Sequence, residues 1–96
     1  MDTPPVPASI NAAGENAEAA WVELLGDLDP AERTAHRLAG TEALALQIGR
    51  MRDAAQDVAE NGLVIIDADG KPHPNPAIET ERDAQAEIRS WTNRLM

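Results

Sequence analysis

The sequence predicts a mainly α-helical fold of three helices, with a small β-hairpin between the second and the third. The 96-residue chain is rich in alanine, the best helix former, and contains two Trp but no Phe or Tyr. Apolar residues recur at helical spacing over three stretches of the chain. An Asp-Pro and an Asn-Pro sequence precede two of these stretches, as is common where helices begin.

The length of the chain fits one domain. Residues 1–10 contain three prolines and are expected to form a flexible arm, which leaves residues 11–96 as a single helical domain. The start has no signal-peptide pattern, and no apolar run is long enough to span a membrane, so we expect a cytoplasmic protein without a membrane partner. A formal net charge of −9 repels nucleic acid unless positive charge is concentrated locally.

The first helix is predicted over residues 11–26. Its apolar residues follow an approximate i, i+3/i+4 pattern: Ala13, Ala17, Ala20, Trp21, Leu24, Leu25 and Leu28. Gly26 is a plausible C-terminal stop.

The second helix has the clearest start. Asp29 stands at the expected N-cap, Pro30 at the first helical position and Glu32 at the third, which is the pattern of a capping box. The helix is expected to run to residue 61, with Gly62 as its stop and with a kink or break allowed at Gly40. Its apolar residues are spaced alternately by four and three, as in a coiled-coil seam: Leu44, Ile48, Met51, Ala55 and Val58.

A β-hairpin is predicted after this helix. Residues 63–67 are strand-like, Asp69-Gly70 signals a tight turn, and residues 71–73 would form the return strand. Such a hairpin is marginal alone, so it is expected to be exposed or paired with a neighbour.

The third helix is predicted over residues 76–95, opened by Asn75-Pro76. Its seam has the same spacing as that of the second helix: Ala84, Ile88, Trp91 and Leu95. The two long helices are expected to form an antiparallel helical hairpin. The seams then serve either as an intramolecular core or, with one face left uncovered, as contacts in a homo-oligomer.

Few residues suggest catalysis. The chain has no Cys, no glycine-rich phosphate loop, and only two histidines, His36 and His73, in different predicted elements. Asp67 and Asp69 fit turn chemistry better than a cation site, because the further oxygen ligands are missing. We therefore expect no enzyme, no cofactor and no metal.

A small group of basic residues follows the sharp turn between the first two predicted helices. Arg33, His36 and Arg37 lie at the start of the second helix, which is a weak version of a DNA-reading arrangement. The alternative is that these residues pair with nearby acids on a solvated surface.

The sequence from residue 61 onward resembles the C-terminal half of small terminase subunits of tailed bacteriophages. The resemblance rests on Asn61-Gly62-Leu63, on Gly70, on the stretch His73-Pro74-Asn75-Pro76-Ala77, and on the Glu-, Arg- and Ala-rich helix that follows. The proline-rich start, the Trp-bearing helix and the Asp-Pro-Ala-Glu start of the long helix also fit this family.

The resemblance implies a non-enzymatic packaging factor. Members of the family assemble as rings through paired helices, recognise viral double-stranded DNA and present it to the large terminase subunit. Carried over, Gly62, Gly70, His73, Pro74 and Pro76 shape the hairpin and the helix start. The seam residues would then make the contacts of the helical hairpin and the ring: Leu44, Ile48, Met51, Val58, Ile88, Trp91 and Leu95. If DNA is bound, Arg33, His36 and Arg37 are the candidates.

Other functions remain open at this point. An acidic helical phage adaptor or head-completion protein, or a regulatory interaction protein, could have the same fold without binding DNA. The strong negative charge favours such a protein.

Overall fold

A computed structural model describes the backbone of residues 4–95 and the side chains of residues 4–93. Residues 1–3 of the predicted arm and the side chain of the seam residue Leu95 lie outside the described part. The elements are α1 (Ala8–Ala13), α2 (Glu15–Gly26), the 3-10 turn η1 (Pro30–Glu32), α3 (Ala35–Asn61), β1 (Val64–Ile66), β2 (Pro72–Pro74) and α4 (Ala77–Leu95). The predicted class, mainly α with a β-hairpin before the last helix, is confirmed.

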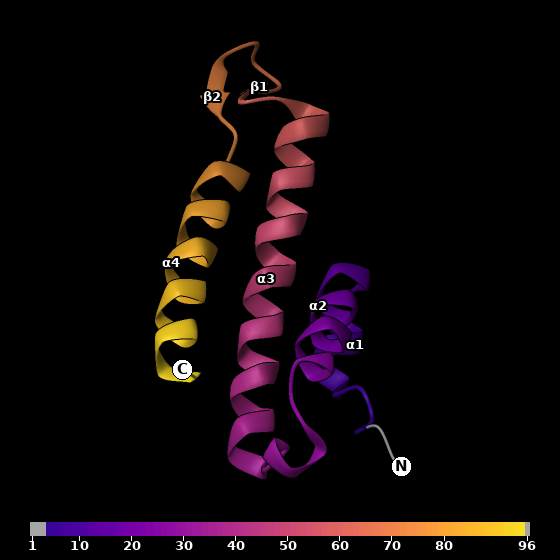
Figure 1. Cartoon of the computed structure of the whole chain (residues 1–96). Coiled ribbons are helices and arrows are strands. Elements are labelled where there is room, and N and C mark those ends of the chain that lie inside the picture. Colours follow the sequence, from indigo (N-terminus) through magenta and orange to yellow (C-terminus); the bar gives the residue numbers. More distant parts are fainter. Residues whose placement is uncertain (1–3, 96) are drawn as a thin grey trace.

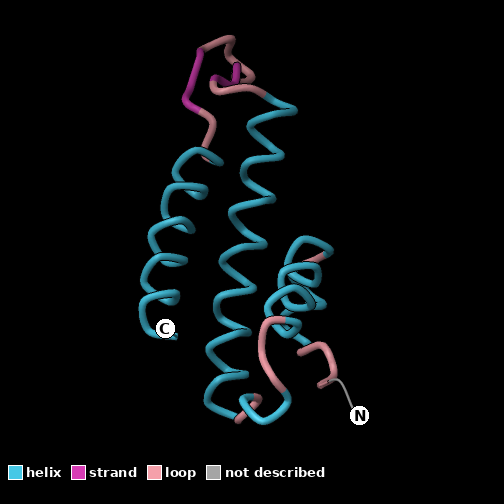
Figure 2. Tube along the Cα trace, in the orientation of Figure 1, coloured by secondary structure: helices cyan, strands magenta, loops and turns pink. Residues whose placement is uncertain are grey.

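The helices form a thin plate (Figure 1). Helix α3 lies in the middle, α4 runs antiparallel along one side of it, and α1 and α2 cover the other side. The described chain measures 56 × 24 × 17 Å. The β-hairpin stands at one end of this helical plate and the turn between α2 and α3 lies at the other, as the tube in Figure 2 shows.

The main core lies between α1, α2 and the middle of α3. Its fully or almost fully buried side chains are small apart from three: Ile10, Trp21 and Leu25. The backbones of α2 and α3 approach closely at Gly49, where an added Cβ would lie 2.8 Å from the Cβ of Ala17. Small residues on both helices therefore set the distance between them.

The first predicted helix begins earlier than expected and is broken. Residues 8–10, assigned above to a flexible arm, belong to α1, and Ile10 is completely buried. Gly14 separates α1 from α2 with φ +107°, a conformation that residues with a Cβ rarely adopt. The chain bends at this glycine because only the bend lets Ile10 reach the core that α2 and α3 form.

The start of the second predicted helix was also placed too early. The capping box of Asp29 and Glu32 is present, but it caps the start of the 3-10 turn η1 and not the start of the long helix. Arg33 leaves helical geometry with ψ +56°, and Thr34 then caps α3 by accepting a hydrogen bond from the Arg37 amide (3.2 Å). From there α3 runs unbroken through Gly40, so the kink or break allowed there does not occur.

The hairpin agrees with the prediction within one residue. Its strands pair antiparallel with Val64 opposite Pro74, Ile65 opposite His73 and Ile66 opposite Pro72. The connecting loop is wider than a two-residue turn, because the last hydrogen bond between the two sides runs from the Asp67 amide to the carbonyl of Lys71 (2.9 Å) and encloses three residues. Inside it, the Gly70 amide bonds the carbonyl of Asp67 (3.0 Å), as in a β-turn. Gly70 has φ +81°, which explains the glycine at this position.

The contact at Gly49 yields a stability prediction. Gly49→Ala should destabilise the fold, because its Cβ meets backbone atoms of Ala17 at 2.9 Å and α2 must move away from α3. Overpacking costs about 1–3 kcal/mol, against about 1 kcal/mol gained in helix propensity. Urea unfolding at fixed protein concentration measures the difference.

Gly26→Ala is the matched control, because no atom lies within 4 Å of its added Cβ. Its midpoint should stay constant or rise. A Gly49→Ala protein as stable as the Gly26→Ala protein would show that the α2–α3 contact is looser than described.

Candidate functional site

The seam between α3 and α4 is only partly closed within one copy of the chain. Leu44 is 6% exposed, and Ala54, Ala77 and Ala84 are also buried. Of the predicted seam residues, five are only half-buried: Ile48, Met51, Val58, Ile88 and Trp91. The helical hairpin predicted from the sequence is thus formed, and it leaves apolar surface at its edges.

The two sides of this seam differ in chemistry. One side carries a groove lined by Ile48, Met51, Arg52, Gln85, Ile88 and Arg89, here named the apolar groove. The other carries a groove lined by Gln47, Arg50, Thr80, Asp83, Ala84 and Glu87, here named the acidic groove. Each residue advances the helix by about 100°, so these two sets lie on opposite flanks of the α3–α4 pair.

Charges in the two grooves are complementary. In the apolar groove Arg52 pairs with Glu23 (3.2 Å), whereas Arg89 has no ion-pair partner among the described side chains. In the acidic groove Asp83 and Glu87 likewise have none within that part of the chain. Unlike surfaces on opposite sides of one protein are what a head-to-tail contact between copies requires.

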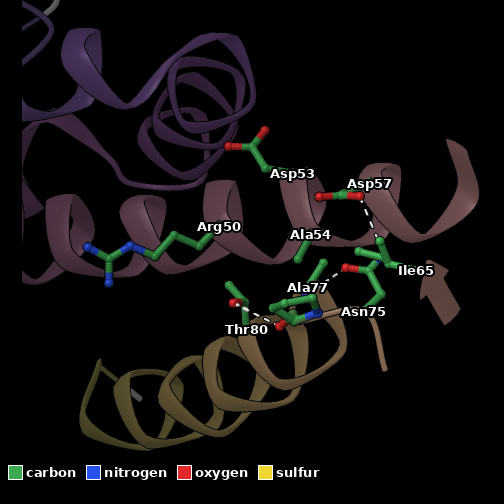
Figure 3. A pocket seen from close by; sticks show the side chains of 9 residues that line it. Arg50, Asp53, Ala54, Asp57, Ile65, Asn75, Ala77 and Thr80 are labelled. Carbon is green, nitrogen blue, oxygen red and sulfur yellow. Dashed lines mark hydrogen bonds between the residues drawn. The ribbon is translucent and has the colours of Figure 1, made fainter. Parts of the chain in front are cut away.

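A third groove lies where the end of α3 meets the hairpin and the start of α4 (Figure 3). Its carboxylates are held by side-chain amides: Asp53 accepts from Asn16 (2.7 Å), and Asp57 accepts from Asn61 (2.7 Å) and Asn75 (3.3 Å). Arg50 lines the same groove with no hydrogen-bond partner among the described residues. The groove is an open surface in which the two acids already have donors.

Asn75 links all three elements around this groove. Its side chain is almost fully buried; it donates to the carbonyl of Gly62 (2.9 Å) and accepts from the Ala77 amide (3.0 Å). The predicted role of Asn75 as the cap of the last helix is therefore confirmed. Its bond to the end of α3 was not predicted, because no local sequence pattern reports a contact 13 residues away.

The basic residues near the α2–α3 turn lie together but are partly engaged. Arg33 donates to the carbonyl of Leu25 at the end of α2 (3.1 Å), and its Nε is buried without a partner in the described structure. Arg37 forms an exposed ion pair with Glu32 (3.7 Å), and His36 is exposed. Arg33 thus holds the turn in place, while His36 and Arg37 face solvent.

The hairpin loop is organised by Asp67. Its carboxylate accepts from the amides of Lys71 (2.8 Å) and Asp69 (2.9 Å), and its second oxygen lies 2.5 Å from His73 Nε2. The hydrogen bond from the Lys71 amide lowers the pKa of Asp67 most, and the bond from His73 lowers it further. These bonds outweigh desolvation, which raises the pKa, so the pKa lies below its usual value of 3.8. Loop stability from this group is therefore present above its usual pKa and is lost as pH falls through the lowered value.

The residues of the predicted motif gather around the hairpin. Gly62 ends α3 with φ +84°, Gly70 closes the loop, His73 bonds Asp67, and Pro74 and Pro76 flank the buried Asn75. These residues lie at the opposite end of the helical plate from Arg33, His36 and Arg37 (Figure 1). The structure does not bring the two predicted groups together.

Within residues 4–95, no three His, Asp or Glu side chains are grouped as metal ligands would be. In the same part of the chain no helix is both long enough and apolar enough to cross a bilayer.

The fold and its grooves define a small helical protein whose distinctive features are open surfaces between helices. A protein-family model described as phage terminase, small subunit, matches residues 17–96. The chain therefore belongs to the family of phage terminase small subunits. Members of this family are generally non-catalytic, and a role in DNA packaging fits the family. Comparison with curated proteins gave no match, and neither did comparison with solved structures.

The position of Asn75 yields a second stability prediction. Asn75→Ala should cost about 1–3 kcal/mol, because α4 loses its cap and the end of α3 loses its link to α4. Asn11→Ala is the control, since Asn11 is exposed and its side chain makes no hydrogen bond to the described residues. Urea unfolding of both variants compares them, and equal midpoints would contradict a structural role of Asn75.

Proposed function

We propose that this protein is a non-catalytic small terminase subunit that assembles into a homo-oligomeric ring, recognises viral DNA and engages the large terminase subunit. The observation that carries this proposal is the family match, which spans residues 17–96 and so covers most of the helical plate. Assembly and DNA contact can each be argued further from the surfaces.

Assembly is supported by the two unlike grooves of the α3–α4 pair. The apolar groove offers half-buried Ile48, Met51 and Ile88 beside the unpaired Arg89. The acidic groove offers Asp83 and Glu87. Placing the apolar groove of one copy on the acidic groove of the next would cover apolar surface and pair the charges. Such a contact repeats head-to-tail and closes into a ring when the rotation permits.

This contact predicts the outcome of a charge exchange. Arg89→Glu should raise the concentration at which assembly is half complete by about tenfold, corresponding to about 1.4 kcal/mol per contact. Adding Asp83→Arg and Glu87→Arg should restore assembly, because the charges are then exchanged on both sides. Native mass spectrometry measures assembly as multiples of the 10.3 kDa subunit.

Lys71→Glu is the control for the change in net charge, because Lys71 lies in the hairpin loop outside both grooves. It should leave assembly unchanged. A monomeric wild-type protein, or a triple variant no better assembled than Arg89→Glu, would count against this arrangement of copies.

DNA contact is supported by the turn between α2 and α3. His36 and Arg37 face solvent at the end of the helical plate, and the partner of Arg37 is an exposed acid. Exposed ion pairs contribute little, so Arg37 can exchange Glu32 for a phosphate at small cost. In an oligomer this basic turn is repeated once per copy, which raises the effective affinity for a long anion.

A salt titration tests this contact. Arg37→Ala should weaken binding of double-stranded viral DNA and lower the slope of log affinity against log salt by about one for each contacting copy. Lys71→Ala, at the opposite end of the plate, should change neither quantity. Fluorescence anisotropy at several salt concentrations measures both the affinity and the slope. An affinity independent of salt would contradict phosphate contact.

A second candidate function is an acidic adaptor, head-completion or regulatory protein that does not bind DNA. The net charge of −9 favours it, as does the structural use of Arg33 at the end of α2. The same titration distinguishes the two functions, since this candidate predicts no binding at any salt concentration.

A further inference from the structure

The first strand of the hairpin and the residue before it leave a run of large apolar side chains in solvent. The exposed fractions are 64% for Leu63, 55% for Val64, 37% for Ile65 and 62% for Ile66. Apolar residues exposed singly are common, but four in succession on a strand usually mark a contact surface. The apolar groove and the acidic groove include none of these four residues, and of the four only Ile65 lines the third groove.

The hydrogen bonds of the hairpin determine which backbone groups point outward. The amide of Asn75 bonds the carbonyl of Leu63 (2.8 Å), and the amide of Asp67 bonds that of Lys71 (2.9 Å). Hydrogen-bonded and non-bonded pairs alternate in an antiparallel ladder, so Ile65 and His73 form the bonded pair between them. Val64 and Ile66 therefore direct their N–H and C=O groups away from β2, and these groups have no partner in the described structure.

The outer edge of β2 is different. The residues opposite Val64 and Ile66 are Pro74 and Pro72, so the positions that face outward on β2 carry no N–H group. A further strand can obtain a full set of hydrogen bonds from the edge of β1 and cannot obtain them from the edge of β2. Proline on an exposed strand edge is a known means of preventing pairing.

We infer that the edge of β1 pairs with the edge of β1 in a second copy of this chain, antiparallel and about a two-fold axis at Ile65. In this register the N–H and C=O of Val64 meet the C=O and N–H of the partner's Ile66. Ile65 lies opposite itself as a non-bonded pair, and every pair over residues 64–66 is β-branched and apolar.

The sequence of the hairpin favours a second copy as the occupant because the strand is complementary to itself. Pairing of β1 with the β2 edge of another copy would leave acceptors without donors at Pro72 and Pro74. The two-fold pairing instead builds a four-stranded sheet whose outer strands are both β2. Its two edges are then blocked by proline, so the association stops at two copies.

The paired surface is small. Three residues per strand bury far less than the roughly 1,200 Å² of a standard stable interface, so the contact is weak between isolated chains. It gains strength where two assemblies meet face to face, because several such two-fold contacts then form at once. It does not depend on the proposed packaging function, because it uses neither groove of the α3–α4 pair.

Disulfide trapping tests the register, since the natural chain contains no cysteine. Ile65→Cys should form a disulfide-linked dimer in oxidised glutathione, because residues facing each other as a non-bonded pair have suitable Cα spacing. Val64→Cys is the matched control: its side chain faces Ile66 of the other copy, and it should react about tenfold more slowly.

Two further variants separate edge pairing from random collision. Ile66→Pro, added to Ile65→Cys, removes an outward N–H that the hairpin itself does not use and should reduce cross-linking to the rate of the control. Ile66→Val keeps that N–H and should retain the fast rate. Circular dichroism confirms that each variant keeps its helices.

Equal rates for Ile65→Cys and Val64→Cys, or fast cross-linking that persists with Ile66→Pro, would overturn the inference. Protection of the Val64 and Ile66 amides from hydrogen exchange only on addition of another protein would assign the edge to a different occupant and would also overturn it. Adding Arg89→Glu to the Ile65→Cys protein separates the two proposals: loss of rings with retained cross-linking means that they are independent.

Discussion

The arrangement of this protein depends on how closely α2 can lie against α3. At Gly49 the two helices approach until there is no room for a further carbon atom beside Ala17. Such an approach is possible because the chain fills its core mainly with alanine, and because Trp21 is the one aromatic side chain within that core. Small residues make close helix contacts but fill little volume, so the core between α1, α2 and α3 is small.

The small core has consequences for the surface. Helix α3 is flanked by α4 on one side and by α1 and α2 on the other (Figure 1). The α3–α4 seam is open on both flanks: Asp83 and Glu87 line one groove together with Arg50, and Arg52 and Arg89 line the other. The chain thus exposes two distinct grooves beside a small core.

Much of the fold could be predicted from local sequence signals. The Asn75-Pro76 cap and the glycines at 62 and 70 each report a local backbone preference: Asn75 caps the last helix, and both glycines have positive φ. The alternating apolar spacing on two consecutive helices indicated that α3 and α4 pack against each other, as they do. The errors came from tertiary contacts. The capping box of Asp29 and Glu32 does not show whether a 3-10 turn or an α-helix follows it. The residues next to Ile10 in the sequence give no sign that its side chain is buried in a core formed by later helices. Among the site residues, the hydrogen bond from Arg33 to the carbonyl of Leu25 could not be predicted, because no helical spacing relates these two residues.

The buried position of Ile10 also bears on where this protein can be shortened. The family match begins at residue 17, whereas the packed unit begins with α1, at Ala8. A fragment cut at the family boundary would lack the isoleucine that fills the space beside Ala17 and Trp21 in the core cluster. The stretch that the family model matches and the stretch that packs around the core therefore have different N-terminal limits in this chain.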